Sequence, residues 1–126
     1  MAYEGVLTKL PRALSGADLR AARYRFGALN SSGQVVVNTT SGGRCLGVIN
    51  DNPPAAGMAC ELAIHGVSRV EASGAIAVNA QVTSDGAGRA ATAAAGQYVM
   101  GVAIEPATAA GDVIAVLIHP VGSLPA

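Results

Sequence analysis

The stretch that decides the fold is Leu46–Val67, LGVINDNPPAAGMACELAIHGV, which recurs without a gap as Met100–Val121, MGVAIEPATAAGDVIAVLIHPV. Each copy contains a short apolar run, a turn that ends in glycine and a longer apolar run. At an offset of 101 − 47 = 54 residues, the same residue types recur for Gly47, Val48, Ala55, Ala56, Gly57, Ile64, His65 and Val67. This repeat predicts a chain of two like halves. Because the repeat preserves turns and apolar strands, it favours a structural role over a catalytic one.

From Arg23 onward, short apolar and β-branched runs alternate with clusters of Gly, Ser, Asn and Asp that are typical of turns. Asn30–Gly33 and Ser84–Gly86 are two such turns, each between runs that read as the strands of a hairpin. The expected strands cover residues 24–29, 34–37, 44–49, 58–65, 67–70, 75–78, 81–83, 89–92, 98–104 and 112–119. This pattern predicts an all-β fold, a small β-sandwich or barrel of short antiparallel strands built from two similar halves.

Residues 1–22 do not share this pattern and are predicted to form an N-terminal arm, whereas residues 23–126 form the β-rich domain. Ser15 is of a residue type that caps helices, and it precedes Ala17–Ala21, so a short helical turn is expected there. The segment is too short and too weakly periodic to be a domain. We therefore expect the arm to pack on the domain or to reach beyond it.

Side chains of a β-strand alternate between the two faces of a sheet, which assigns an inner and an outer face to the repeated long strand. In the first copy the apolar inner face is Cys60, Leu62 and Ile64, and the outer face is Ala59, Glu61, Ala63 and His65. In the second copy the inner face is Ile114, Val116 and Ile118, and the outer face is Val113, Ala115, Leu117 and His119. An apolar outer face usually has a cover, either the arm or a neighbouring subunit. Val113, Ala115 and Leu117 are therefore the candidate subunit interface.

The composition favours an oligomer. Apolar residues make up 51% of the chain and charged residues 13%, but there are only three Tyr, one Phe and no Trp. A core of small aliphatic side chains buries little area, and a subunit interface supplies further apolar burial. The net charge is zero, so no nucleic-acid partner is expected. No membrane partner is expected, because the longest apolar run, Val113–Ile118, is far below the roughly 20 residues of a spanning helix. No signal peptide is expected, because Met1–Gly5 lacks a basic start followed by an apolar stretch.

No group of residues has the spacing of a catalytic, cofactor or metal site, so no enzyme and no cofactor are expected. His65 and His119 occupy equivalent positions of the repeat, which suits either a metal pair or two strand-end side chains. The serines lie in turn clusters, and no Gly-x-Ser-x-Gly elbow occurs. Cys45 and Cys60 lie in strand-like runs and are expected to be free buried thiols, with a disulfide as the alternative.

The N-terminal part is mildly basic, which suits either a solvated face or docking onto an acidic partner surface. The residues concerned are Arg12, Arg20, Arg23 and Arg25.

Several stretches, in this order and spacing, resemble the small capsid decoration (cement) proteins of tailed phages. Asp18–Phe26, DLRAARYRF, is similar to that family's DLs-x-x-QYR motif, with Arg23 where the family often has Gln. Gly47–Gly57 is similar to its GVL-x-x-x-P-x-x-G stretch, and Asp85–Ala90 and Gly101–Asp112 continue the match.

The resemblance implies a non-enzymatic protein that is made in the host cytoplasm and added to the outside of an icosahedral head. Such proteins often sit as trimers at local three-fold positions and bridge neighbouring major capsid subunits. The implied partners are the major capsid protein and further copies of the chain. On this interpretation the arm docks on the capsid, and its candidate contacts are Tyr3, Lys9, Arg12 and Arg20.

Two other functions stay open from the sequence. A β-sandwich binding module for glycan or a host surface relies on exposed aromatic side chains, for which Tyr3, Tyr24 and Tyr98 are the candidates. A small hydrolase needs a carboxylate partner for His65 or His119 that the sequence does not reveal.

Overall fold

The computed structural model describes residues 7–125, and within that range the chain forms strands, turns and loops but no helix. The strands are β1 Leu7–Lys9, β2 Phe26–Leu29, β3 Val35–Val37, β4 Gly47–Ile49, β5 Leu62–Glu71, β6 Gln81–Ser84, β7 Ala90–Thr92, β8 Tyr98–Ala103 and β9 Val113–Ser123. The all-β prediction is confirmed.

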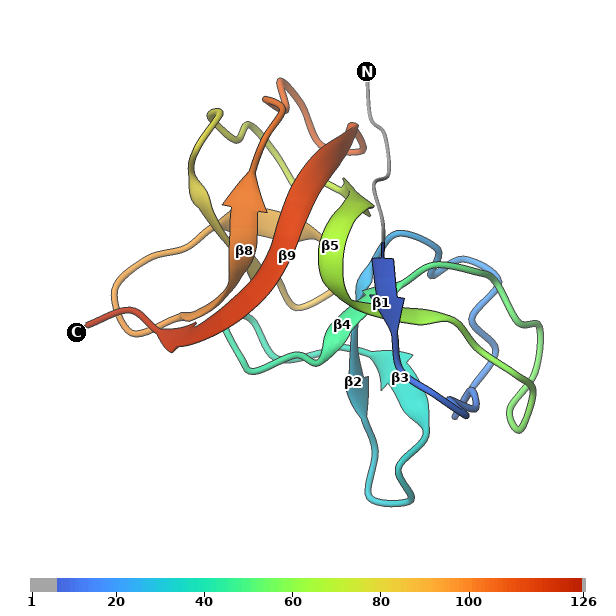
Figure 1. Cartoon of the computed structure of the whole chain (residues 1–126). Helices are drawn as coiled ribbons and strands as arrows, with labels where there is room; N and C mark the ends of the chain where they lie inside the picture. The colour runs from blue at the N-terminus through green and yellow to red at the C-terminus, as the bar shows by residue number, and fades with distance from the viewer. Residues whose placement is uncertain (1–6, 126) are drawn as a thin grey trace.

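All strand pairs are antiparallel and belong to one sheet, which curls into a half-barrel (Figure 1). The strand order is β3-β2-β4-β5-β9-β8-β6-β7, with β1 pairing to β5 outside this path. In Figure 1 the long strands β5 and β9 lie side by side and curve together, and β8 follows on the far side of β9. The first half contributes β3-β2-β4-β5. The second half contributes β9-β8-β6-β7, which are the equivalent strands in the reverse order.

The predicted repeat is present in the strand pairing. Val48 pairs with Ala63 across β4 and β5, and Val102 pairs with Leu117 across β8 and β9, each residue 54 positions later. The hairpins repeat too, at an offset of 55: residues 28 and 36 pair across β2 and β3, and residues 83 and 91 pair across β6 and β7. The repeat therefore extends over eight strands, and the second half has one residue fewer between its hairpin and the strand that follows.

The two hairpin turns use the same backbone chemistry. Asn30 Oδ1 accepts the N–H groups of residues 32 and 34 at 3.0 and 2.9 Å, and Asp85 Oδ1 accepts those of residues 87 and 89 at 2.9 and 2.8 Å. Gly33 and Gly88 follow with φ values of 75° and 80°, where a side chain is disfavoured. Asn and Asp are different residue types, but their acceptor oxygens satisfy the turn in the same way.

The halves meet where β5 and β9 pair. Gly66 pairs with Ile118, and the register continues to Glu71 opposite Val113. His65 precedes Gly66 on β5, and His119 follows Ile118 on β9. The two histidines are equivalent positions of the repeat, and their ring centroids are 5.4 Å apart. The two halves are therefore joined by antiparallel pairing of their equivalent long strands.

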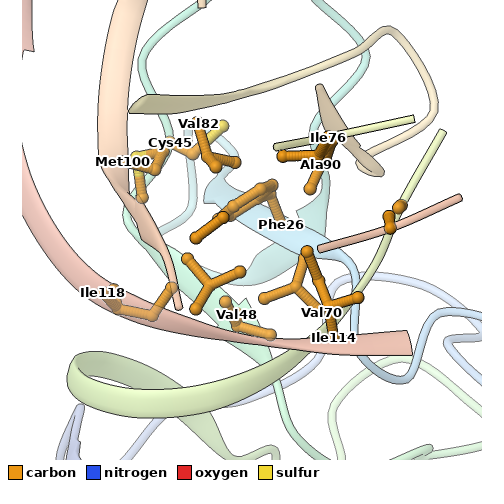
Figure 2. Packing of buried hydrophobic residues seen from close by; sticks show 14 of the residues in the cluster. Phe26, Cys45, Val48, Val70, Ile76, Val82, Ala90, Met100, Ile114 and Ile118 are labelled. Atoms are coloured by element: carbon orange, nitrogen blue, oxygen red, sulfur yellow. The ribbon is translucent and has the colours of Figure 1, made fainter. Parts of the chain in front are cut away.

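Both halves contribute to one main core around Phe26, whose ring is fully buried (Figure 2). The surrounding side chains are mostly small and aliphatic, as the composition predicts. The cluster is Phe26, Cys45, Val48, Ala63, Val70, Ala72, Ile76, Val82, Ala90, Met100, Ala103, Ala107, Ile114, Val116 and Ile118. The predicted inner face of the second long strand is thereby confirmed.

The described part of the arm packs on the first half. Its Leu10, Ala13, Leu19 and Ala22 join a second cluster with Val35, Ile49, Cys60 and Leu62. Strand β1 pairs with β5, and Leu10 N–H donates to the Leu62 carbonyl at 3.0 Å. Residues 7–22 are therefore held by main-chain hydrogen bonds as well as by apolar contacts.

The expected helical turn after Ser15 is wrong, because the Ser15 side chain bonds a different part of the chain. Its Oγ donates to the Ala55 carbonyl at 2.6 Å and accepts the Met58 N–H at 3.1 Å. In the second half the matching turn is capped from within, since Asp112 accepts the Thr108 N–H at 2.8 Å. That backbone hydrogen bond is the main cause of a lowered pKa at Asp112.

The prediction also divides one strand in two and places another strand where none forms. β5 runs through residues 62–71 without a break, because Gly66 adopts a φ of 111° that lets the strand bend and continue. Residues 75–78 form no strand, and Ile76 makes a single bridge with Ala107.

We expect Gly101→Ala and Gly47→Ala each to destabilise the fold by about 3 kcal/mol, because an added Cβ would overlap a backbone carbonyl oxygen of the paired strand. The blocking oxygens belong to Leu117 and Ala63, which are equivalent in the repeat. Gly74→Ala is the control: its Cβ would enter open space, and we expect a change within about 0.5 kcal/mol. Urea unfolding measures all three, and wild-type stability in the Gly101 variant would contradict the close approach.

Candidate functional site

The outer face of β9 carries an exposed apolar stripe. Val113 and Leu117 are each 38% exposed, and Val121 is 58% exposed. Leu117 pairs with Val67 on one side and Val102 on the other, and both of these side chains are half-buried. We call these five residues the apolar stripe. Because they come from β5, β9 and β8, they lie across three adjacent strands of a rigid sheet.

Ala115 does not belong to this exposed face, which corrects the prediction. It is fully buried, although it alternates with Val113 and Leu117 along β9. Next to it, Glu105 Oε1 accepts the Ala115 N–H at 2.8 Å. Ala63, the other misassigned alanine, is buried where it pairs with both Val48 and Lys9.

Of the predicted docking residues, Tyr3 lies outside the described residues. Lys9 Nζ bonds Glu61 Oε1 at 2.7 Å, and Arg20 makes a bidentate pair with Asp18, 2.7 Å at its shortest. The hydrogen bond from Arg20 lowers the pKa of Asp18. Arg12 is exposed and has a φ of 58°. Lys9 and Arg20 are thus each matched to a carboxylate.

The fold forms a second basic group, of which the sequence indicates only the N-terminal part. We call it the arginine–tyrosine cluster; it comprises Arg23, Tyr24, Arg25, Arg69, Glu71 and Arg89. Glu71 accepts Arg25 at 3.5 Å and lies 3.7 Å from Arg89. The sequence places basic residues at 23 and 25, whereas Arg69 and Arg89 come from distant parts of the chain. Only the strand register brings them together.

The two histidines lie edge to face at 78°, and both are exposed. In the described range neither imidazole has a carboxylate partner, and no group of three or more His, Cys, Asp or Glu side chains has the arrangement to hold a metal ion. Among residues 7–125 there is also no helix long and apolar enough to cross a membrane.

Tyr24 and Tyr98 are both half-buried. Tyr24 lies beneath two guanidinium groups, and Tyr98 packs against the main core. A cavity of about 310 Å³ is lined instead by Ala28, Leu29, Arg44, Cys45 and Leu46, none of which is aromatic. The described tyrosines therefore do not form a shared stacking platform for a sugar.

Cys45 and Cys60 are free and buried, as expected. Burial raises the pKa of Cys45 to about 11. Burial, reinforced by the nearby charge of Asp51, raises the pKa of Cys60 to about 12. Both side chains are therefore protonated thiols at neutral pH, and they act as small apolar groups in the two cores.

Comparison with known proteins gives a consistent picture. A family model described as "Phage cement protein" matches residues 26–118. Among solved structures, the chain is similar to "head fiber gp8.5 N base in bacteriophage phi29", with a TM-score of 0.69 and 16% sequence identity, over 90% of this chain and 95% of that chain. At this identity the likeness shows the fold alone. No curated protein matches the sequence.

We expect neither thiol to react quickly with Ellman's reagent in the native protein at pH 8, because both pKa values lie far above that pH and both side chains are buried. In denaturing urea both should react at the rate of a free thiol. Native labelling at that same rate would contradict the assigned burial.

Proposed function

The chain belongs to the phage cement protein family, and from that premise we propose that it binds the outer surface of an icosahedral phage head and stabilises it by bridging major capsid subunits. Its role is structural rather than enzymatic. The observation that supports this most directly is the family match, which spans strands β2 to β9. A structural protein of the capsid acts by binding other proteins through its surface. The apolar stripe and the arm are therefore the candidate binding surfaces.

The apolar stripe is proposed as the contact between copies of the chain. Val113, Leu117 and Val121 project from a single strand, so a second copy can cover them without any change in the fold. The corresponding part of the first half differs: Glu61 stands where the second half has Ala115, and it pairs with Lys9. An apolar contact centred on β9, with a charged surface at Glu61 of the first half, suits a cyclic assembly, and a homotrimer is the proposed state.

The N-terminal arm is proposed as the capsid-docking segment, with Tyr3, Lys9, Arg12 and Arg20 as its contacts. Residues 7–22 are fixed to the body by β1 and by Leu10, Ala13 and Leu19. An anchored arm presents its exposed side chains in a defined position, which lowers the entropy lost on docking. Truncating the whole arm would remove part of the second core, so point variants are the suitable test.

Bridging follows from the assembly. Three linked copies make three simultaneous contacts with the shell, which raises the overall affinity without a strong individual site. Each trimer would then hold neighbouring capsid subunits at a fixed spacing and oppose their separation under the pressure of packaged DNA.

The function is tested on heads of the encoding phage prepared without this chain. We expect the added chain to co-sediment with them and saturate, and the decorated heads to release their DNA at a higher temperature than bare heads. An unrelated β-rich protein of similar mass is the control. Absence of co-sedimentation, or binding without any change in DNA release, would contradict the proposed function.

We expect Leu117→Glu to convert the trimer to a monomer and weaken head binding, because it places a charge in an apolar contact. Leu29→Glu is the matched control, since Leu29 is also on a strand and is 43% exposed, close to the 38% of Leu117. Light scattering gives the mass of each variant. A Leu117 variant with the mass of wild type would rule out the stripe as the interface.

A further inference from the structure

The 54-residue repeat keeps one polar side chain, and this side chain belongs to neither a core nor a turn. Of the eight residue types that recur at this offset, seven are Gly, Ala, Val or Ile, and the eighth is the histidine at 65 and 119. Both histidines are exposed, whereas the equivalent residues next to them, Ile64 and Ile118, pack in or against the two cores. Packing therefore does not account for the histidines, which leaves imidazole chemistry as the property that the two copies share.

The fold brings these two side chains together. His65 precedes Gly66 on β5 and His119 follows Ile118 on β9, and Gly66 pairs with Ile118 where the two strands lie side by side (Figure 1). The ring centroids are 5.4 Å apart, and the rings lie edge to face at 78°. Within residues 7–125 neither imidazole makes a hydrogen bond or an ion pair. Each neutral ring therefore keeps a nitrogen whose lone pair is available to a ligand.

The separation of the rings suits one metal ion between them. Two imidazoles that bind an ion at about 2.0–2.1 Å in tetrahedral geometry have ring centroids about 5 Å apart. The observed 5.4 Å is close to this value, and both side chains are exposed, so rotation of the rings is enough to aim their nitrogens at one point. The backbone needs no change, because the pairing of Gly66 with Ile118 fixes the two strands beside the histidines. Imidazole nitrogen is a suitable ligand for Cu²⁺, Ni²⁺ and Zn²⁺.

The neighbours of the pair do not compete with a metal ion. On the same face of the strands they include Val67 on β5, and Leu117 and Val121 on β9, which carry no polar side-chain atoms. The positive charge of Lys9, which follows the β1 residue opposite His65, is paired with Glu61 at 2.7 Å. An ion between the histidines would therefore meet an apolar rim and a compensated charge.

We propose that His65 and His119 together chelate one divalent transition-metal ion, of the class Cu²⁺, Ni²⁺ and Zn²⁺, through one ring nitrogen each. Two protein ligands leave the remaining coordination positions to water, so this is an exchangeable surface site rather than a closed structural one. The ion would connect β5 to β9, the strands that join the two halves, and would stabilise the native chain by binding to it. This inference goes beyond the proposed function and does not rest on it.

Isothermal titration calorimetry of the untagged chain with copper, nickel and zinc chlorides tests the site. The sequence contains no other histidine, and the two thiols are buried and protonated, so neither supplies a competing soft ligand. We expect one ion per chain, with Cu²⁺ bound most tightly and Mg²⁺ not bound. His65→Gln and His119→Gln should each weaken Cu²⁺ binding by about tenfold or more, because a single imidazole lacks the gain of an intramolecular second contact.

Thr8→Ala is the matched control. Thr8 is exposed on β1 and pairs with His65, but it supplies no imidazole, so Cu²⁺ affinity should be unchanged. Urea unfolding without metal checks that every variant is folded, which we expect because all three side chains are exposed. Added Ni²⁺ should raise the unfolding midpoint of wild type and of Thr8→Ala, but not that of the double variant His65→Gln/His119→Gln.

Electron paramagnetic resonance of the copper complex gives the identity of the ligands. We expect two nitrogen ligands in wild type and at most one in either single variant. Equal Cu²⁺ affinity in wild type and the double variant would overturn the proposal, and so would Mg²⁺ binding as tight as that of Cu²⁺, since that would indicate a carboxylate site. A ratio below one ion per chain would also contradict it, because the ligands would then come from different copies.

Discussion

The antiparallel pairing of β5 with β9 is the interaction on which the rest of the structure depends. It joins equivalent strands of two like halves, with Gly66 opposite Ile118 and Glu71 opposite Val113. In each half the next strand approaches the long strand through a glycine, Gly47 in β4 and Gly101 in β8. Glycine is required there because the carbonyl oxygen of the long strand leaves no room for a Cβ. The curled sheet that results encloses the main core around Phe26 (Figure 2). A core of small side chains is sufficient here because both halves supply it.

The repeat made much of this fold predictable. It placed the second long strand and its inner face correctly at Ile114, Val116 and Ile118. The repeat of the hairpins was harder to find, because Asn30 and Asp85 serve the same role with different residue types and at an offset of 55. A comparison of residue types does not match Asn30 with Asp85, although both supply the acceptor oxygen that the turn requires.

The errors came from contacts between residues distant in sequence. Strict alternation assigns Ala63 and Ala115 to the outer face, but both side chains are fully buried, and Ala63 packs in the main core. The local sequence of Ser15 predicts a helix cap, but its side chain bonds residues 55 and 58. The sequence does not predict the arginine–tyrosine cluster for the same reason, since Arg23 and Arg69 come together only in the folded sheet.

The two halves share a scaffold and differ in their outer surfaces. The arm and its Lys9–Glu61 pair lie on the first half, whereas the second half exposes Val113 and Leu117. On the proposed function, duplication supplies the rigid sheet and the differences between the copies supply the contacts. The most direct test is a cryo-electron microscopy map of phage heads incubated with the chain. The account predicts added density on the outer surface that touches at least two capsid subunits. Density that touches one subunit only, or none on the exterior, would contradict it.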